Sequence, residues 1–117
     1  MSAETELLLK MYAAFNRREI ETVLSQLHPD VDWPNAWEGG RVHGHAEVRE
    51  YWTRQRAAVD PSVEPNGFEP LDDGRLAVDV HQVVRDLDGR SIGAADVRHV
   101  YSFRGELIVR MDVEAED

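Results

Sequence analysis

The sequence contains no cysteine. Disulfide bonds, thiolate metal sites and a cysteine nucleophile are therefore excluded, and the composition suits a reducing compartment such as the cytoplasm. The sequence also lacks any apolar run that approaches the roughly 18 residues of a membrane-spanning helix. Its first residues are acidic and polar, unlike those of a signal peptide. We therefore expect a cytoplasmic protein with neither a membrane span nor a signal peptide.

Basic residues are scarce: 13 Lys and Arg stand against 23 Asp and Glu, which gives a net charge of −10. Nucleic acids and anionic membranes are bound through patches of Lys and Arg, so neither is an expected partner. The 42% of hydrophobic and 31% of charged residues are typical of a folded globular protein. The length of 117 residues predicts one domain, residues 1–117, built around a single core.

Apolar residues recur at helical spacing in three segments, near residues 3–16, 18–27 and 45–59. The first segment has one apolar face, formed by Leu8, Met11, Tyr12 and Phe15. The third segment ends before a proline and has one stripe made of Val48, Trp52 and either Gln55 or Arg56. We predict three helices in the N-terminal half of the chain.

After Pro61 the hydrophobic period changes from about 3.6 to about 2, which indicates β-strands. Turn residues divide this part of the chain into four expected strands, at 63–71, 76–87, 92–103 and 107–113. A further short strand, 31–33, lies between the second and third helices. Helices followed by a meander of strands predict an α+β domain. Its three helices should pack on one face of a strongly bent, mostly antiparallel sheet of about four to six strands.

All three tryptophans lie in the 25-residue segment from His28 to Trp52. Trp33 ends the short strand before a proline, Trp37 lies in a glycine-rich loop, and His43 precedes the third helix. Aromatic rings beside imidazoles at a strand-to-helix connection suit a concave site for a small molecule. The alternative is that the tryptophans only fill the core, and the sequence leaves both interpretations open.

Further candidates lie on the predicted strands and on the first helix. His99 and Tyr101 share a strand face with apolar neighbours, which indicates either a proton carrier in a pocket or a structural histidine bonded within the core. Tyr12, on the apolar face of the first helix, is either a pocket hydroxyl or a core tyrosine. His81 and Arg85 share a strand face that lines a pocket or, by hydrophobic periodicity alone, faces outward.

The last predicted strand alternates Arg110 and Asp112 with apolar residues, which should form its core face: Leu107, Val109, Met111 and Val113. Asp112 is then a surface residue, unless a shift of one position in the preceding turn reverses every side chain and makes it a catalytic candidate. His43 and His45 are close in sequence, but no third ligand accompanies them, so no metal site is predicted. We expect no cofactor.

Three segments carry a resemblance to a known family: MYAAFNRREIETVLSQLHPDVDWP, GRVHGHAEVREYW and, more weakly, HVYSFRGELIVRMDV. The chain resembles the nuclear transport factor 2-like (NTF2-like) superfamily, in its SnoaL-like or ketosteroid-isomerase-like branch. The resemblance implies a cone, in which a bent sheet wraps around a long helix and an apolar pocket opens at one end. It also implies pairing of two copies through the outer face of the sheet. It does not fix the function, because this fold hosts several chemistries.

The resemblance also has consequences for single residues. Tyr12 matches the hydrogen-bonding tyrosine of the steroid isomerases, and their protonated aspartic acid falls on His99. Their carboxylate base falls at Trp33, and strand alternation turns the adjacent Asp32 to the opposite side. We therefore do not expect steroid isomerisation by the usual mechanism. The family's strand register turns His81 and its neighbours on the same strand face inward.

The epoxide-hydrolase branch needs an Arg-x-Asp pair on the long central strand, where this chain has Asp79-Val80-His81, so that chemistry is not expected either. We expect a pocket for a small apolar molecule, lined by Tyr12, Trp33, Trp52, His81, Arg85, His99 and Tyr101, with Trp37 and His43 at its mouth. His99 would move a proton and Tyr12 or Tyr101 would stabilise an oxyanion, in cofactor-free isomerase, cyclase or lyase chemistry. The alternative is a binding or dimerisation module without turnover. A homodimer is expected through an apolar outer sheet face that contains Val78, Val80, Val84 and Val100.

Overall fold

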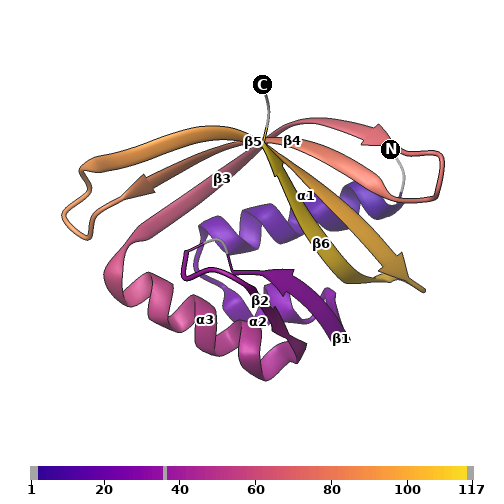
Figure 1. Ribbon diagram of the computed structural model, residues 1–117, viewed down its shortest axis with the longest axis horizontal. Coiled ribbons are helices and arrows are strands. Elements are labelled where there is room, and N and C mark those ends of the chain that lie inside the picture. The colour runs from indigo at the N-terminus through magenta and orange to yellow at the C-terminus, as the bar shows by residue number, and fades with distance from the viewer. Residues whose placement is uncertain (1–2, 36, 116–117) are drawn as a thin grey trace.

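A computed structural model describes residues 3–35 and 37–115. The elements follow in the order α1 (Ala3–Asn16), α2 (Ile20–Leu24), β1 (Leu27–Pro34), β2 (Arg41–His43), α3 (Gly44–Ala58), β3 (Asp60–Pro70), β4 (Leu76–Arg85), β5 (Ser91–Arg104) and β6 (Leu107–Ala115). The strands form one sheet in the order β2-β1-β6-β5-β4-β3 (Figure 1). All neighbours are antiparallel except β1 and β6, which are parallel. The predicted α+β fold is confirmed.

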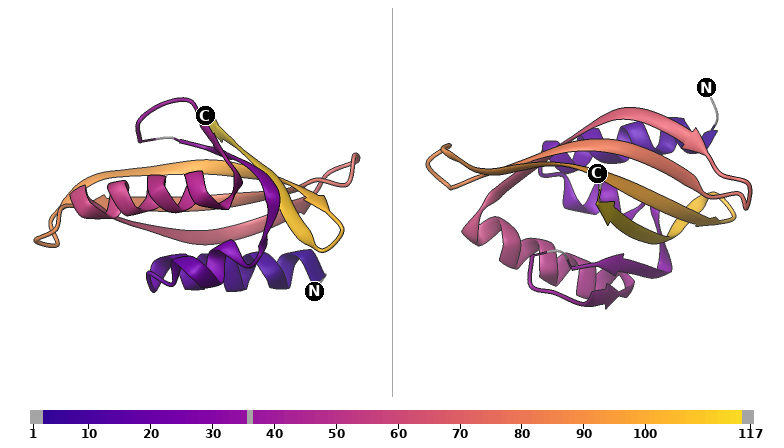
Figure 2. Two further views of the ribbon diagram at one scale, coloured as in Figure 1. Left: turned by 90° about the horizontal axis from the view of Figure 1, so that it is seen from below. Right: turned by 45° about the horizontal axis from the view of Figure 1, so that its top comes forward.

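The sheet is strongly bent around the helices. The long strands β3, β4 and β5 form the top of the molecule in Figure 1, and the sheet turns downward through β6 to reach β1 and β2. α1 and α3 lie beneath the long strands, and the two views of Figure 2 show that both helices stay on the same side of them. Irregular register between Pro65 and Gly67 and between Ser102 and Phe103 interrupts the ladders, and such bulges bend the strands that carry them.

The helix that follows α1 is shorter than predicted. Instead of a helix over 18–27, α2 ends at Leu24 and β1 already begins at Leu27. The backbone N–H of Ile108 donates to the carbonyl of Gln26, and Leu27 pairs with Ile108 in the sheet. Pairing with β6, which is distant in sequence, therefore overrides the local helical pattern. The short strand β2, which pairs with β1, was not predicted.

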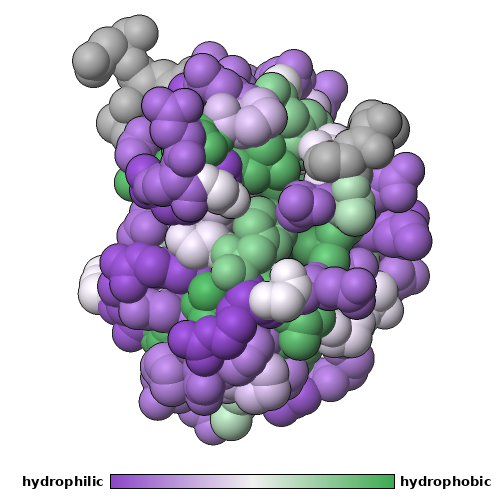
Figure 3. Space-filling view, turned by 90° about the vertical axis from the view of Figure 1, so that its right-hand side faces the viewer, coloured by the Kyte–Doolittle hydropathy of each residue, from purple (hydrophilic) through white to green (hydrophobic). Residues whose placement is uncertain are grey.

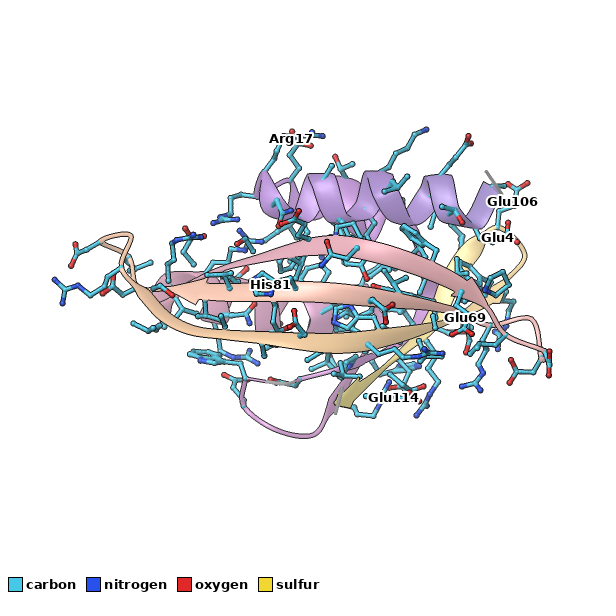
Figure 4. All side chains as sticks on the ribbon, turned by 90° about the horizontal axis from the view of Figure 1, so that it is seen from above. Glu4, Arg17, Glu69, His81, Glu106 and Glu114 are labelled. Carbon is cyan, nitrogen blue, oxygen red and sulfur yellow. The ribbon has the colours of Figure 1, made fainter. Side chains whose placement is uncertain are left out.

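The register of β4 decides which of its faces is buried. Val78 and Val80 are buried in the core, on the sheet face that the helices cover, and Val78 pairs with His99. His81, one position further, faces the other side, where its Nδ1 lies 2.8 Å from the Asp96 carboxylate. The inward orientation expected for His81 and Arg85 is therefore wrong, and hydrophobic periodicity was the better guide. Figure 4 looks onto this outer face, with His81 near its middle.

The expected apolar outer face of the sheet is also wrong. Of the four valines assigned to it, Val78 and Val80 are in the core and Val84 lines an internal cavity. Val100 lies on the outer face, where it pairs with Ala77 and Asp112, and it is itself buried. The outer face also carries exposed charged residues, among them Asp79 and Asp96.

Strand β6 follows the predicted alternation near its end. Met111 pairs with Tyr101 and is buried, while Asp112 lies on the opposite side. The irregularity at Ser102 and Phe103 leaves Val109 without a partner and buries Ile108 in place of Leu107.

The edge of the sheet at β3 is covered by the end of α1. The side-chain amide of Asn16 donates to the carbonyl of Val63 at 2.6 Å, and its oxygen accepts the Val63 N–H at 2.9 Å. β3 also contains three prolines, Pro61, Pro65 and Pro70, which have no N–H to donate. α1 is thus fixed along β3, two strands away from β5, which carries His99 and Tyr101.

The surface is largely hydrophilic. Figure 3 shows one end of the molecule, where a strip of hydrophobic side chains reaches the surface between hydrophilic ones. Among the described residues, no helix is both long and apolar enough to cross a membrane.

Candidate functional site

A cavity of about 210 Å³ lies between the helices and the inner face of the sheet. Its walls come from all three helices, from β1 and the loop after it, and from β3, β4, β5 and β6. Aromatic and aliphatic side chains dominate the lining, with a few neutral polar groups. Among the described residues, those that line the cavity include no Asp, Glu, Lys or Arg. The site is therefore an apolar chamber without a fixed charge in its walls.

Three polar side chains meet in the wall of this cavity. The Tyr12 hydroxyl on α1 lies 2.9 Å from Nδ1 of His99 and 2.6 Å from the Tyr101 hydroxyl. The Tyr101 hydroxyl is also 3.4 Å from the same nitrogen. His99 and Tyr101 come to the same face because they are two positions apart on β5, and Tyr12 reaches them from the apolar face of α1. All three side chains are almost completely buried.

One arrangement of protons satisfies the buried donors of this cluster. The Tyr101 hydroxyl is fully enclosed, and it finds an acceptor in the Tyr12 oxygen. The Tyr12 hydroxyl then donates to Nδ1 of His99. In a neutral imidazole whose Nδ1 accepts, the proton sits on Nε2. The opposite direction, in which Nδ1 donates to Tyr12, would leave one of the two buried tyrosine O–H groups without a good acceptor.

Burial keeps all three groups of this cluster neutral at pH 7. Desolvation lowers the pKa of His99 from 6.5 to about 4. Burial raises the pKa of Tyr12, although its hydrogen bond with Tyr101 partly opposes that shift. Burial and the neighbouring Tyr12 raise the pKa of Tyr101. His99 can thus present an N–H to a molecule in the cavity, but its low basicity makes it a poor proton acceptor.

The tryptophans form the other large part of the cavity wall. Trp33 and Trp52 are 7% and 2% exposed and meet edge to face, with ring centroids 5.7 Å apart at 87°. Trp52 also contacts Phe15 edge to face, and Trp33 lies 6.2 Å from the Tyr101 ring. These are favourable aromatic geometries, so this part of the wall is stabilised by its own contacts.

Trp37 lines the cavity from the loop after β1 and is 42% exposed, which places it at the mouth. The loop is held by the buried Asn35, whose side-chain oxygen accepts the N–H of Glu38 and whose amide donates to the Glu38 carboxylate. The same carboxylate receives two hydrogen bonds from Arg54 on α3, at 2.8 and 3.0 Å. The hydrogen bonds from Arg54, and to a smaller extent the one from Asn35, lower the pKa of Glu38 to about 2. The loop that carries Trp37 is therefore fastened to α3.

The structure brings together six of the residues predicted from the sequence: Tyr12, Trp33, Trp37, Trp52, His99 and Tyr101. Their functional roles stay predictions. Two other candidates, His81 and Arg85, lie on the outer face of β4 and do not line this cavity.

His43 and Asp112 were also assigned to the site, and the structure places both elsewhere. His43 is exposed and pairs with Asp32 in the β1–β2 ladder, on the side opposite to Trp33, and its backbone N–H donates to Glu47. Asp112 lies on the outer side of β6, where it accepts hydrogen bonds from Arg110 and Arg41. The assignment of His43 was wrong because the loop before it ends in a strand that was not predicted, β2. The position of Asp112 confirms that the hydrophobic periodicity of β6, which made this residue a surface residue, was the better guide.

The sequence reasoning missed several lining residues, among them Tyr51, Gln55, Gln82 and Met111. Gln55 had a signal, since either it or Arg56 was expected on one stripe of the third helix with Val48 and Trp52. The orientation of Gln82 needed the register of β4, which the sequence left open. In the described part of the chain, no three His, Asp or Glu side chains converge as metal ligands.

Comparison with solved structures places this geometry among known folds. TerC, co-crystallised with polyporic acid, is 29% identical with a TM-score of 0.84, over 98% of this chain and 92% of that chain. An NTF2-like protein of unknown function from Burkholderia pseudomallei K96243 is 27% identical with a TM-score of 0.84, over 99% and 92%. A Mycobacterium tuberculosis protein in complex with estradiol-17beta-hemisuccinate is 16% identical with a TM-score of 0.82, over 97% and 93%, and shows the shared fold.

Sequence comparison gives the family. No curated protein matches the chain. A family model described as the SnoaL-like domain matches residues 8–111, which is most of the sequence and includes every member of the Tyr12–His99–Tyr101 cluster. The resemblance seen in the sequence is thereby confirmed, and the protein belongs to the SnoaL-like domain family, with an NTF2-like fold.

Proposed function

We propose that the protein binds a small, neutral, ring-containing molecule in the cavity, and that Nε2–H of His99 donates a hydrogen bond to an oxygen of that molecule. The observation that carries the proposal is the chain from Tyr101 through Tyr12 to Nδ1 of His99 in the wall of a cavity without charged lining. Among the described residues, the hydrogen bonds of His99 all use Nδ1, so Nε2 is left for a ligand. Tyr12 and Tyr101 bond to each other and to His99, so they position the imidazole rather than bind the ligand themselves.

The absence of charge in the lining supports a neutral ligand. An ion that entered this cavity would lose its hydration and find no opposite charge among the lining residues described. The net charge of −10 further disfavours anions. An acidic ligand should therefore bind in its protonated form.

The volume of the cavity limits the size of the ligand. An engineered apolar cavity of about 150 Å³ accommodates benzene. The cavity of about 210 Å³ suits a somewhat larger molecule with one or two fused rings. The structural neighbour TerC, which carries polyporic acid in its crystal structure, supports a ring-containing ligand for this chain.

The proposal is tested by titration with α-tetralone, a neutral bicyclic ketone, followed by tryptophan fluorescence. All three tryptophans line the cavity, so binding should change their emission. His99→Phe removes the N–H donor and should weaken binding about three- to tenfold, the effect of losing one neutral hydrogen bond. His81→Phe, on the outer face, is the matched control and should bind like the wild type. No saturable change with the wild type, or equal losses in both variants, would contradict the proposal.

A catalytic role is the second candidate, and the neutral His99 favours it. A neutral imidazole N–H can stabilise the enolate that forms when a proton leaves the carbon beside a ketone. Since no carboxylate lines the described cavity, the proton would pass to a water molecule, and a proton from water would later return to the same carbon. Exchange of the α-hydrogens of α-tetralone for deuterium in D2O, followed by NMR, tests this role. Acceleration by the wild type that His99→Phe removes would indicate catalysis, whereas binding without acceleration would indicate a binding module.

We also propose that two copies associate through the outer face of the sheet. The structure gives this face charged and polar groups of both signs, such as Asp79, Asp96 and Arg98, so its contacts would be largely polar. Light scattering at micromolar concentration should show twice the monomer mass of 13.3 kDa. A mass near that of the monomer would contradict this proposal and leave the ligand site unaffected.

A further inference from the structure

Two ion pairs of the same geometry connect α3 to different parts of the protein. Arg49 donates two hydrogen bonds to the carboxylate of Glu21, at 2.7 and 2.8 Å. Arg54 donates two to the carboxylate of Glu38, at 3.0 and 2.8 Å. The two arginine side chains are 45% and 49% exposed, so their access to water is similar. The pairs differ in what they hold, because Glu21 belongs to α2 and Glu38 belongs to the loop that carries Trp37.

This loop has few other polar links to the rest of the protein. Residues 37–40 are all exposed. In the part of the chain that the structure describes, their hydrogen bonds go only to Asn35, at the base of the same loop, and to Arg54. Segments with few buried contacts open at a low cost in free energy. The ion pair between Glu38 and Arg54 is therefore the main polar link that opposes opening of this loop.

The position of Trp37 connects this link to the cavity. Trp37 lines the cavity and is also 42% exposed, so its ring lies where the cavity meets the solvent. The groups that would bind the ligand lie deeper, since His99 is only 7% exposed. A ring-containing molecule that enters beside Trp37 has to push the indole aside. The indole can move only as far as its loop allows, and the ion pair restrains that loop.

We infer that Glu38 and Arg54 are positioning residues that hold Trp37 at the mouth of the cavity and so limit how fast a ligand enters and leaves. The inference rests on the proposed function of the cavity and adds control of ligand exchange to it. Neither charged residue lines the cavity, so neither touches the ligand. Loss of the pair eases opening of the loop equally with and without ligand. The association and dissociation rates therefore rise together, and the Kd stays the same.

The test follows the exchange of α-tetralone by stopped-flow tryptophan fluorescence in Arg54→Met and Arg49→Met. Methionine keeps part of the aliphatic stem of arginine and removes the guanidinium. Loss of one exposed ion pair is a small change, so both variants should fold, and Arg54→Met should raise both rate constants about two- to fivefold. Arg49→Met breaks the matched pair to α2 and should exchange the ligand like the wild type.

A variant of the carboxylate shows whether the ion pair itself is responsible. Glu38→Gln should raise the rates as Arg54→Met does, and the double variant should be no faster than either single one, because both changes break one contact. Unchanged rates in Arg54→Met, or equal increases in Arg54→Met and Arg49→Met, would overturn the inference. A change in Kd without a change in the association rate would do the same.

A second measurement uses no ligand and so separates this inference from the proposed function. In Trp37→Phe, which keeps an aromatic ring at the mouth, the remaining tryptophans are Trp33 and Trp52, both buried in the cavity wall. Their quenching by acrylamide, a small neutral amide, reports how readily a solute enters. Adding Arg54→Met should raise the quenching constant about two- to fivefold, and adding Arg49→Met should not.

The two measurements can fail independently. If the wild type does not bind α-tetralone but the difference in quenching is present, the proposed function is wrong and the control of access to the cavity stands. If α-tetralone binds but the two arginine variants are quenched alike, the control of access is wrong and the ligand site stands.

Discussion

Two histidines on neighbouring strands of the same sheet have opposite surroundings. His99 on β5 faces the helices, is 7% exposed and is bonded to Tyr12, which is bonded in turn to Tyr101. His81 on β4 faces the other side, where its side chain is 40% exposed and is paired with the carboxylate of Asp96. The inner histidine is held neutral by desolvation, while the outer one has water and a counter-charge. The face of the sheet, rather than the residue type, decides which of the two can serve an apolar ligand site.

The largest expected effect concerns the inner wall of the cavity. Trp33→Ala removes a buried ring that contacts Trp52 and Tyr101, and should lower the free energy of unfolding by about 3–5 kcal/mol. Trp37→Ala, at the exposed mouth, is the matched control and should cost far less. Denaturant unfolding measures both, and equal losses would mean that the mouth and the inner wall are not as different as their burial indicates.

The second effect is a pH dependence of stability that comes from His99. The pKa of this histidine is 6.5 when exposed and about 4 in the folded protein, so the unfolded chain binds the proton more readily between these values. Stability should therefore fall as the pH drops from about 6.5 to about 4, by at most about 1.4 kcal/mol per pH unit from this group. Unfolding curves of the wild type and His99→Phe should diverge in slope over this window. Parallel curves would show that His99 is not held neutral by the fold.

A smaller loss is expected at the centre of the hydrogen-bond chain. Tyr12→Phe keeps the ring but leaves Nδ1 of His99 and the Tyr101 hydroxyl with only their weak mutual contact of 3.4 Å. The cost should be about 1–3 kcal/mol of unfolding free energy, because two buried polar groups lose their partner. Weaker binding of α-tetralone should accompany it, since the imidazole is no longer held in place. An unchanged stability would show that the cluster is not a connected chain.

The smallest effect is expected on the outer face. Asp96→Asn removes the charge that faces His81, and exposed ion pairs contribute only about 0–1 kcal/mol. Thermal unfolding should therefore change little, and ligand binding not at all. A loss as large as that of Tyr12→Phe would remove the distinction between the two faces.

The inner face was the easier one to predict from the sequence. α1 was predicted with its observed bounds, and the alternation along β5 correctly placed His99 and Tyr101 together. Both inferences rest on local periodicity, and both elements pack an apolar face against the core. The meeting of Tyr12 with these residues required the family resemblance, because 87 residues separate Tyr12 from His99.

The errors arose where long-range pairing or register decides the outcome. The chain after Leu24 leaves the helical pattern to pair with β6, and β2 exists because it pairs with β1. The direction of His81 and Arg85 depended on the register of β4, where the family pattern misled and the row of valines on the opposite face was the sounder guide.

The pairing of Asn16 with the edge strand has a consequence for behaviour at high concentration. An open sheet edge is a template on which a second chain can add a strand, and such growth leads to aggregates. On β3 the side chain of Asn16 already occupies both outward backbone groups of Val63, and three positions of the strand are proline. A strand arriving from another molecule would find few free donors and would have to displace this amide. The side chain that fixes α1 beside the cavity thus also keeps the sheet from extending into a fibril at this edge.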